Sequence, residues 1–220
     1  MAGSLPEATT LAWPDQPRAQ QQVALHAADV LRRGGLVVYP TDTVYGIGAD
    51  ASQAEAIERV YRVKGRPDEK AIIWLVASID DVRATCRIDE AAERLAARYW
   101  PGALTLVLAR RVPAAGQLAT LGVRVPAHPA ALAIIQALRS PVATTSANRS
   151  GEPSARDARE ASAALGAEVD LIIDAGPSPV GQESTVLDLT TTPPRVLRAG
   201  ALSAAAVEEA LGDAIEADAR

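Results

Sequence analysis

The sequence predicts one α/β domain built on a twisted mixed sheet that is flanked by helices. Hydrophobic residues make up 48% of the 220 residues, but aromatic residues make up only 3% and phenylalanine is absent. Alanine, valine, leucine and isoleucine must therefore fill the core, which favours helices packed on a sheet. Apolar runs and amphipathic stretches alternate at first, and three apolar runs then crowd the last third of the chain. This order is typical of an α/β domain with a mixed sheet.

Each helix is predicted from its pattern together with a signal at one of its ends. Gly34 closes the first helix, because a residue without a Cβ suits the left-handed C-terminal cap. Ser52 and Glu55 form a capping box for a second helix, which runs through about Tyr61 and ends at residues 65–67. Polar caps are predicted for later helices at Asp89, at Ser154 with Asp157, and at Ser203. Helices are predicted at residues 18–34, 52–61, 89–100, 128–140 and 154–166, and from 203 onward.

The strands are predicted from short apolar runs bounded by turn residues. Residues 71–77 form a continuous apolar run of the kind that is buried on both faces of a sheet. The predicted strands lie at residues 36–40, 71–77, 103–109, 121–126, 141–147, 169–174, 184–189 and 195–199. We expect residues 1–18 to be an N-terminal extension, 19–212 the single folded domain and 213–220 a C-terminal tail.

The composition disfavours several classes of protein. Apolar runs stay well below the roughly 18 residues of a membrane span, and the N-terminus lacks an export signal, so we expect a cytoplasmic protein without membrane contact. The single cysteine, Cys86, excludes an internal disulfide, and with two distant histidines the sequence does not suggest a zinc site. A net charge of −5 argues against nucleic-acid binding through a broad basic face, although a local basic pocket is compatible with it.

The stretch "YPTDTVYGIGADA", residues 39–51, admits three interpretations. A dinucleotide site needs its first glycine at the strand end, whereas residues 40–45 separate Gly46 from the strand, which disfavours this interpretation. A tight turn with glycines at positive φ explains Gly46 and Gly48 but not Thr41 and Thr43. The third interpretation is a row of hydroxyls that faces a ligand beyond a strand end.

Two other segments combine groups that suit anions. The only lysines, Lys64 and Lys70, flank Arg66 in "KGRPDEK", which indicates either a solvated helix end or a rigid set of donors for a triphosphate. The segment "TTSANRSGEPS", residues 144–154, is either an ordinary loop or a phosphate or carboxylate site beside a helix N-terminus. A catalytic triad is not apparent, so chemistry would rest on positioning and charge stabilisation.

Seven segments together resemble the YrdC-like family of L-threonylcarbamoyladenylate synthases, in order and spacing, from about Leu31 to Leu202. They are "YPTDTVYGIGADA", "VYRVKGRPDEKAIIWLV", "YWPGALTLVL", "GVRVP", "TTSANRSGEPS", "ESTVLDL" and "RVLRAG". The resemblance implies a YrdC-like fold with a concave basic cavity, in the single-domain form. It also implies a nucleotidyltransferase that condenses L-threonine, bicarbonate or CO2, and ATP into L-threonylcarbamoyladenylate and pyrophosphate, with Mg²⁺ carried by the ATP rather than by protein ligands.

The resemblance also implies a partner and a set of site residues. The partner is a threonylcarbamoyl transferase complex that forms N6-threonylcarbamoyladenosine in tRNA, with at most a weak contact between this chain and tRNA. The implied catalytic residues are Lys64 and Arg66. Threonine binding is implied for Thr43, Arg124, Ser146 and Ser184, and ATP binding for Arg66, Lys70, Thr120, Thr144, Asn148, Ser154 and Arg198. Leu75 stands where some relatives place a histidine near threonine, so this chain departs from those relatives at that contact.

Two alternatives belong to other functional classes. The first is an RNA-binding module, against which the net charge of −5 and the few tyrosines and tryptophans weigh. The second is a related domain that uses carbamoyl phosphate, which is usually found in much longer chains.

Overall fold

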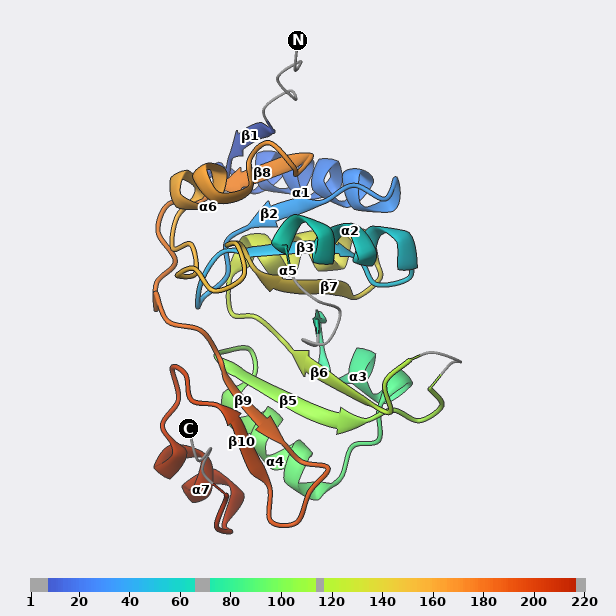
Figure 1. Cartoon of the computed structure of the whole chain (residues 1–220), viewed down its shortest axis with the longest axis vertical. Coiled ribbons are helices and arrows are strands. Elements are labelled where there is room, and N and C mark those ends of the chain that lie inside the picture. The colour runs from blue at the N-terminus through green and yellow to red at the C-terminus, as the bar shows by residue number, and fades with distance from the viewer. Residues whose placement is uncertain (1–7, 66–71, 114–116, 217–220) are drawn as a thin grey trace.

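The computed structural model describes residues 8–65, 72–113 and 117–216, and among these it contains ten strands in one mixed sheet flanked by helices (Figure 1). The sheet order is β1 (Thr9–Ala12), β8 (Leu171–Asp174), β2 (Val37–Tyr39), β3 (Gly46–Asp50), β7 (Val142–Ser146), β4 (Ile73–Leu75), β6 (Thr120–Arg124), β5 (Leu104–Ala109), β9 (Thr185–Asp188) and β10 (Arg195–Arg198). The predicted fold class is therefore confirmed. Within the described residues, no helix has the length and apolarity that a membrane span requires.

The half of the sheet from β1 to β7 is covered by helices on both faces (Figure 1). Helices α1 (Pro17–Arg32) and α5 (Pro129–Leu138) pack on one face, and α2 (Ala54–Lys64) and α6 (Ala158–Leu165) pack on the other. Successive residues of β2 point to opposite faces of the sheet. Val37 therefore packs in the core with α1 and α5, whereas Val38 packs in the core with α2 and α6. This burial on both sides explains the continuous apolar runs in the sequence.

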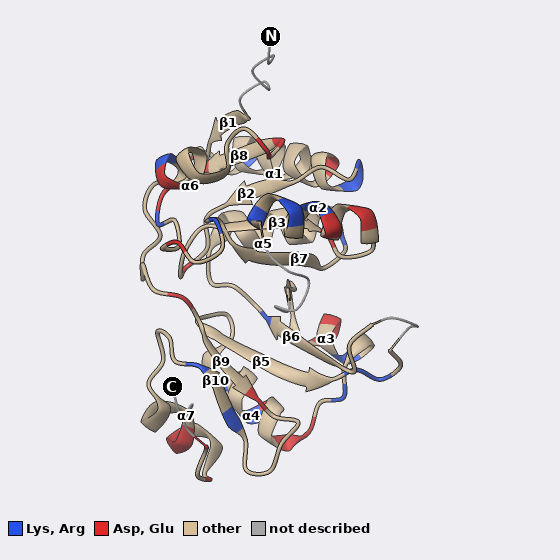
Figure 2. Ribbon diagram, in the orientation of Figure 1, with Lys and Arg blue, Asp and Glu red and all other residues tan. Residues whose placement is uncertain are grey.

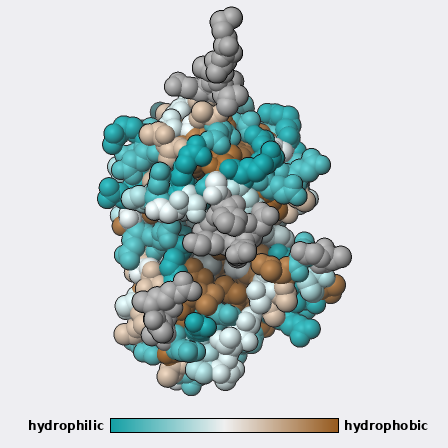
Figure 3. Space-filling model, viewed as in Figure 1, coloured by the Kyte–Doolittle hydropathy of each residue, from teal (hydrophilic) through white to brown (hydrophobic). Residues whose placement is uncertain are grey.

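Among the described residues, helices cover only one face of the half of the sheet from β6 to β10. Helices α3 (Ile79–Thr85), α4 (Glu90–Tyr99) and α7 (Ala204–Leu211) pack there against the alternate residues Leu104, Leu106 and Leu108 of β5. Val107 and Leu197 lie on the opposite face, which lines a cavity between the two halves. Figure 3 shows hydrophobic surface near the middle of this half of the molecule. The short strand β4 links the halves by pairing with β7 and β6.

Some predicted helix caps are confirmed and others are wrong. The side chain of Asp89 accepts a hydrogen bond from Ala92 N, and that of Ser203 accepts one from Ala206 N, as predicted. The capping box at Ser52 is wrong, because the Ser52 hydroxyl donates to Asp50 and Gln53 is the N-cap of α2. The prediction that α6 starts at Ser154 is also wrong. The helix begins after the cap Asp157.

The glycines of "YPTDTVYGIGADA" are in a strand, so their prediction as turn residues is wrong. Gly46 and Gly48 belong to β3, which pairs antiparallel with both β2 and β7. An added Cβ on Gly48 would lie 2.4 Å from Val142 Cγ1, so the close strand packing requires glycine there. Sequence patterns missed β3 because glycine is rare in strands. They also missed α3 and the edge strand β1, which lies inside the segment 1–18.

Candidate active site

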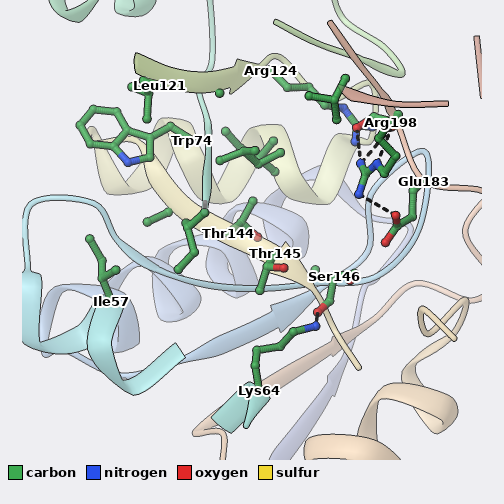
Figure 4. A pocket seen from close by; sticks show the side chains of 18 of the residues that line it. Ile57, Lys64, Trp74, Leu121, Arg124, Thr144, Thr145, Ser146, Glu183 and Arg198 are labelled. Carbon is green, nitrogen blue, oxygen red and sulfur yellow. Dashed lines mark hydrogen bonds and ion pairs between the residues drawn. The ribbon is translucent and has the colours of Figure 1, made fainter. Parts of the chain in front are cut away.

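A cavity of about 1050 Å³ lies between the two halves of the sheet, and side chains from both halves line it (Figure 4). Every described residue of the predicted site lines this one cavity. These residues are Thr43, Lys64, Thr120, Arg124, Thr144, Ser146, Asn148, Ser154, Ser184 and Arg198. The remaining two predicted site residues, Arg66 and Lys70, lie outside the described residues. Segments that are far apart in the sequence therefore meet at one place.

The two threonines of the loop between β2 and β3, Thr41 and Thr43, have different roles. The Thr41 hydroxyl donates to Val44 O at 2.6 Å and accepts from Thr43 N at 3.2 Å, so it builds the turn. The Thr43 hydroxyl accepts a hydrogen bond from Arg124 Nη1 at 2.8 Å. Both threonines line the cavity, but Thr41 shapes the loop whereas Thr43 is linked to the arginine.

Arg124 is held in a buried ion pair that the sequence analysis missed. Its Nη2 atom lies 2.6 Å from Asp42 Oδ1, and the two side chains are only 5% and 11% exposed. Asp42 Oδ1 also accepts from Ala127 N at 2.9 Å, and Arg124 Nε donates to Gly102 O at 2.8 Å. Burial lowers the pKa of Arg124, and the adjacent Asp42 opposes this shift. Asp42 lies between Thr41 and Thr43 in the sequence, and this acidic residue could have indicated an ion pair with a basic residue elsewhere in the chain.

Lys64 is buried in the cavity wall rather than solvated at the end of α2. Its Nζ atom donates to Ser146 O at 2.7 Å and to Asn148 Oδ1 at 2.8 Å, and the residue is 2% exposed. The Ser146 hydroxyl donates to the same Asn148 oxygen at 2.6 Å. These contacts tie the helix end to the loop after β7 (Figure 4). The lysine charge is thereby fixed at one position on the wall, as electrostatic stabilisation of an anion requires.

A second polar cluster lies at the ends of β9 and β10. Arg198 Nη2 donates to Ser184 O at 2.9 Å and to Ser184 Oγ at 3.1 Å. Arg198 Nη1 lies 2.6 Å from Glu183 Oε2, and the Ser154 hydroxyl donates to Glu183 Oε1 at 2.7 Å. The Ser184 and Thr105 hydroxyls are 2.8 Å apart. Arg198, Ser184 and Ser154 were predicted from the sequence, whereas Glu183, the common partner of Arg198 and Ser154, was not.

The Thr144 hydroxyl forms hydrogen bonds to buried protein groups, although the residue also lines the cavity. Tyr39 OH donates to Thr144 Oγ1 at 2.8 Å, and Thr144 Oγ1 donates to Ile47 O at the same distance. Burial raises the pKa of Tyr39, so its hydroxyl stays a protonated donor at neutral pH. Leu75 is 1% exposed and packs in the core with Tyr39, and it also borders the cavity.

The described part of the cavity carries balanced charge. Its lining contains four basic residues, Lys64, Arg110, Arg124 and Arg198, and four acidic residues, Glu58, Glu152, Glu183 and Asp188. Figure 2 shows both signs of charge on α2, which borders the cavity. The predicted basic cavity is therefore not shown by the described residues. Those residues also contain no group of three or more His, Cys, Asp or Glu side chains that could hold a metal ion.

One end of the cavity is apolar and aromatic. Ile57, Trp74 and Leu121 face this end, opposite the cluster of Arg198 and Glu183 (Figure 4). The guanidinium of Arg110 stacks over the Trp74 ring, with 4.9 Å from Cζ to the ring centroid. The cavity thus has hydroxyls and the Arg198 guanidinium at one end, and flat apolar surface with the Arg110 guanidinium at the other.

Fold and cavity together define an α/β protein with a cavity between two halves of one mixed sheet, lined by polar side chains at one end and apolar side chains at the other. Residues 29–200 match the Sua5_yciO_yrdC family, which is described as "Telomere recombination". The chain therefore belongs to the Sua5/YciO/YrdC family, and the resemblance inferred from the sequence is confirmed.

Individual relatives refine this comparison. Threonylcarbamoyl-AMP synthase of Pyrococcus abyssi is 43% identical over 85% of this chain, which covers 56% of that relative. The protein of the same name from Chromobacterium violaceum is 37% identical, with 83% of this chain and 92% of the relative covered. The crystal structure of P. abyssi Sua5 complexed with L-threonine is similar with a TM-score of 0.87 at 38% identity, covering 96% of this chain and 63% of that chain. This chain therefore spans little more than half of the first relative.

Proposed function

We propose that this chain is an ATP-dependent synthase of L-threonylcarbamoyladenylate. The observation that carries the proposal is that ten predicted site residues, from segments distant in sequence, line one cavity. Relatives named threonylcarbamoyl-AMP synthase, and a relative bound to L-threonine, support the same substrate class. We assign the activity to residues 19–212, with 1–18 as an extension and 213–220 as a tail.

The threonine substrate is assigned to the end of the cavity near Arg124. Its carboxylate would meet Arg124 and the Thr43 hydroxyl, while Ser146 and Ser184 complete the pocket. Arg124 already bonds Asp42, so it offers the substrate a guanidinium whose orientation is fixed by buried contacts. A charge held in this way needs no reorganisation when the substrate arrives.

The nucleotide is assigned to the remaining polar groups of the cavity. Arg66, Lys70, Thr120, Thr144, Asn148, Ser154 and Arg198 would bind ATP, and Arg66 would act with Lys64 in catalysis. Cations around a triphosphate offset the charge that grows as pyrophosphate leaves. Mg²⁺ would come with the phosphates, because Mg²⁺ is commonly held by substrate phosphates.

The reaction proceeds through two bond-forming steps. The threonine amine attacks CO2, which forms a C–N bond and releases a proton to solvent. A carbamate oxygen then attacks the α-phosphorus of ATP, and the bond from this phosphorus to the bridging oxygen of the β-phosphate breaks. Threonylcarbamoyladenylate and pyrophosphate result. Lys64, fixed by Ser146 and Asn148, stabilises charge during this transfer.

The product suits a cytoplasmic partner that transfers the threonylcarbamoyl group to tRNA. A mixed anhydride is reactive toward nucleophiles, so a transferase complex must accept it soon after release. We assign tRNA recognition to that complex, because the net charge of −5 argues against nucleic-acid binding through a broad basic face.

Pyrophosphate release tests the proposed function. We expect the purified protein with Mg²⁺ to release pyrophosphate from ATP only when threonine and bicarbonate are both present. Lys64→Met should abolish this release, because it removes the fixed charge, while circular dichroism reports whether the variant folds. Asp80→Asn, on the exposed face of α3, is the matched control and should keep full activity. Release that does not depend on threonine would contradict the proposal.

A further inference from the structure

Glu183 joins two residues assigned to ATP through a single carboxylate. Its Oε1 atom accepts from the Ser154 hydroxyl at 2.7 Å. Its Oε2 atom lies 2.6 Å from Arg198 Nη1, and Figure 4 shows this ion pair. These are the two kinds of donor, a hydroxyl and a guanidinium, that bind phosphate oxygens in proteins. A carboxylate of the protein therefore occupies positions that suit an anionic ligand.

The contacts of Glu183 cross the cavity from one half of the molecule to the other. Ser154 lies in the loop between β7 and α6, whereas Arg198 ends β10 in the other half. Glu183 lies in the segment that connects these halves between β8 and β9 (Figure 1). Glu183 O accepts from Ala201 N at 2.9 Å, and a Cβ added to Gly200 would lie 2.5 Å from the same oxygen. The backbone is thus tightly packed, which leaves the side chain as the part able to move.

We propose that Glu183 is an internal competitor that sets the affinity of the cavity for polyphosphates. Its carboxylate holds Arg198 and Ser154 together in the free protein and releases them when phosphate oxygens replace it. The identity of the ligand as the triphosphate of ATP rests on the proposed function. Glu183 is then a specificity-determining residue, because it favours ligands with enough negative charge to displace it.

Charge and exposure decide whether removing the Glu183 charge strengthens or weakens polyphosphate binding. The Arg198 and Glu183 side chains are 41% and 30% exposed, so their ion pair is weak and costs little to break. The carboxylate stays beside the cavity after it is displaced, and there it repels the polyphosphate. Removing its charge should therefore strengthen polyphosphate binding, although solvent screening limits the gain to about tenfold.

Calorimetric titration with inorganic tripolyphosphate and with ATP tests the proposal on the intact protein. We expect Glu183→Gln to tighten the binding of both ligands by about five- to tenfold. Glu183→Ala, which also removes the hydrogen-bond acceptor, should tighten it at least as much. Glu152→Gln removes the same charge from an exposed position on the cavity rim and should change the Kd by less than twofold. A variant with a damaged fold would bind polyphosphate more weakly. Tighter binding would therefore show that Glu183 does more than support the fold.

The outcomes separate this proposal from the proposed function. Unchanged or weaker binding in both Glu183 variants, with wild-type binding intact, overturns the role of Glu183 alone. An equal gain in affinity for Glu152→Gln also overturns the role of Glu183, because loss of any negative charge near the cavity would then have the same effect. Failure of the wild type and of all variants to bind either ligand overturns the polyphosphate site, and the proposed function with it.

Discussion

The buried ion pair between Asp42 and Arg124 gives the strongest prediction about stability. Asp42→Asn removes the negative charge but keeps an oxygen at nearly the same position. Arg124, which is 5% exposed at its side chain, would then carry a positive charge in the protein interior without a compensating anion. We expect this substitution to lower the free energy of unfolding and to weaken the site at the same time.

The magnitude follows from the contacts that are lost and those that remain. Breaking a buried pair by removing one partner costs roughly 3–5 kcal/mol. The asparagine oxygen can still accept from Ala127 N and Arg124 Nη2, which lie 2.9 Å and 2.6 Å from Asp42 Oδ1. We therefore expect the lower end of that range, about 3 kcal/mol. Asp80→Asn, at the exposed pair with Arg83, should cost less than about 0.5 kcal/mol.

Urea unfolding followed by tryptophan fluorescence measures these changes. The double variant Asp42→Asn with Arg124→Met leaves no uncompensated charge, so its loss should be smaller than the sum of the single losses by about 2 kcal/mol. The reasoning is refuted if Asp42→Asn lies within 1 kcal/mol of the wild type, or if the two single losses simply add. Either result would mean that solvent reaches Arg124 and compensates its charge.

Three further substitutions test strand packing, substrate recognition and a titrating carboxylate. Gly48→Ala places a Cβ 2.4 Å from Val142 Cγ1 and should cost about 1–3 kcal/mol in the same urea titration; no loss would show that the strands can separate at no cost. Thr43→Val removes the hydroxyl beside Arg124 and should raise the KM for threonine far more than that for ATP, while equal changes would count against the assignment. The folded-state pKa of Asp50 is lowered, because hydrogen bonds from Ser52 and Ser140 outweigh the opposing effect of burial. Its stabilisation is therefore complete above the unfolded pKa of about 3.9 and is lost as the pH falls through the lower folded value. Asp50→Asn should thus be less stable than the wild type at pH 7, and the difference should shrink as the pH falls below the unfolded pKa; a difference that does not change with pH would refute this.

Local signals predicted most elements of the fold, and the exceptions have physical causes. Gly65 has φ +60° and closes α2, as the residue without a Cβ that a left-handed cap favours. Strand β3 was unpredictable from propensity, since it is held by pairing on both sides and by close packing that excludes larger side chains. The N-cap of α2 was mispredicted because the Ser52 hydroxyl bonds Asp50 instead of the helix. The first failure arises from pairing between segments that are distant in sequence, whereas the second arises from a competing hydrogen bond to a residue two positions away.

The candidate site shows the same division between local and tertiary information. The motifs identified the cations and hydroxyls that line the cavity, including Lys64 and Arg198. They did not identify the carboxylates Asp42 and Glu183, whose partners are 82 and 15 positions away in the sequence. A lone acidic residue in a loop is usually solvated, so only the folded chain reveals which cation it meets.

The chemical identity of the product tests the central claim most directly. The protein is incubated with ATP, Mg²⁺, L-threonine and radiolabelled bicarbonate, and the nucleotides are separated by chromatography. The account predicts a new labelled adenylate that contains threonine and forms in equal amount with pyrophosphate. A folded protein that binds ATP and threonine but yields no labelled adenylate would contradict it.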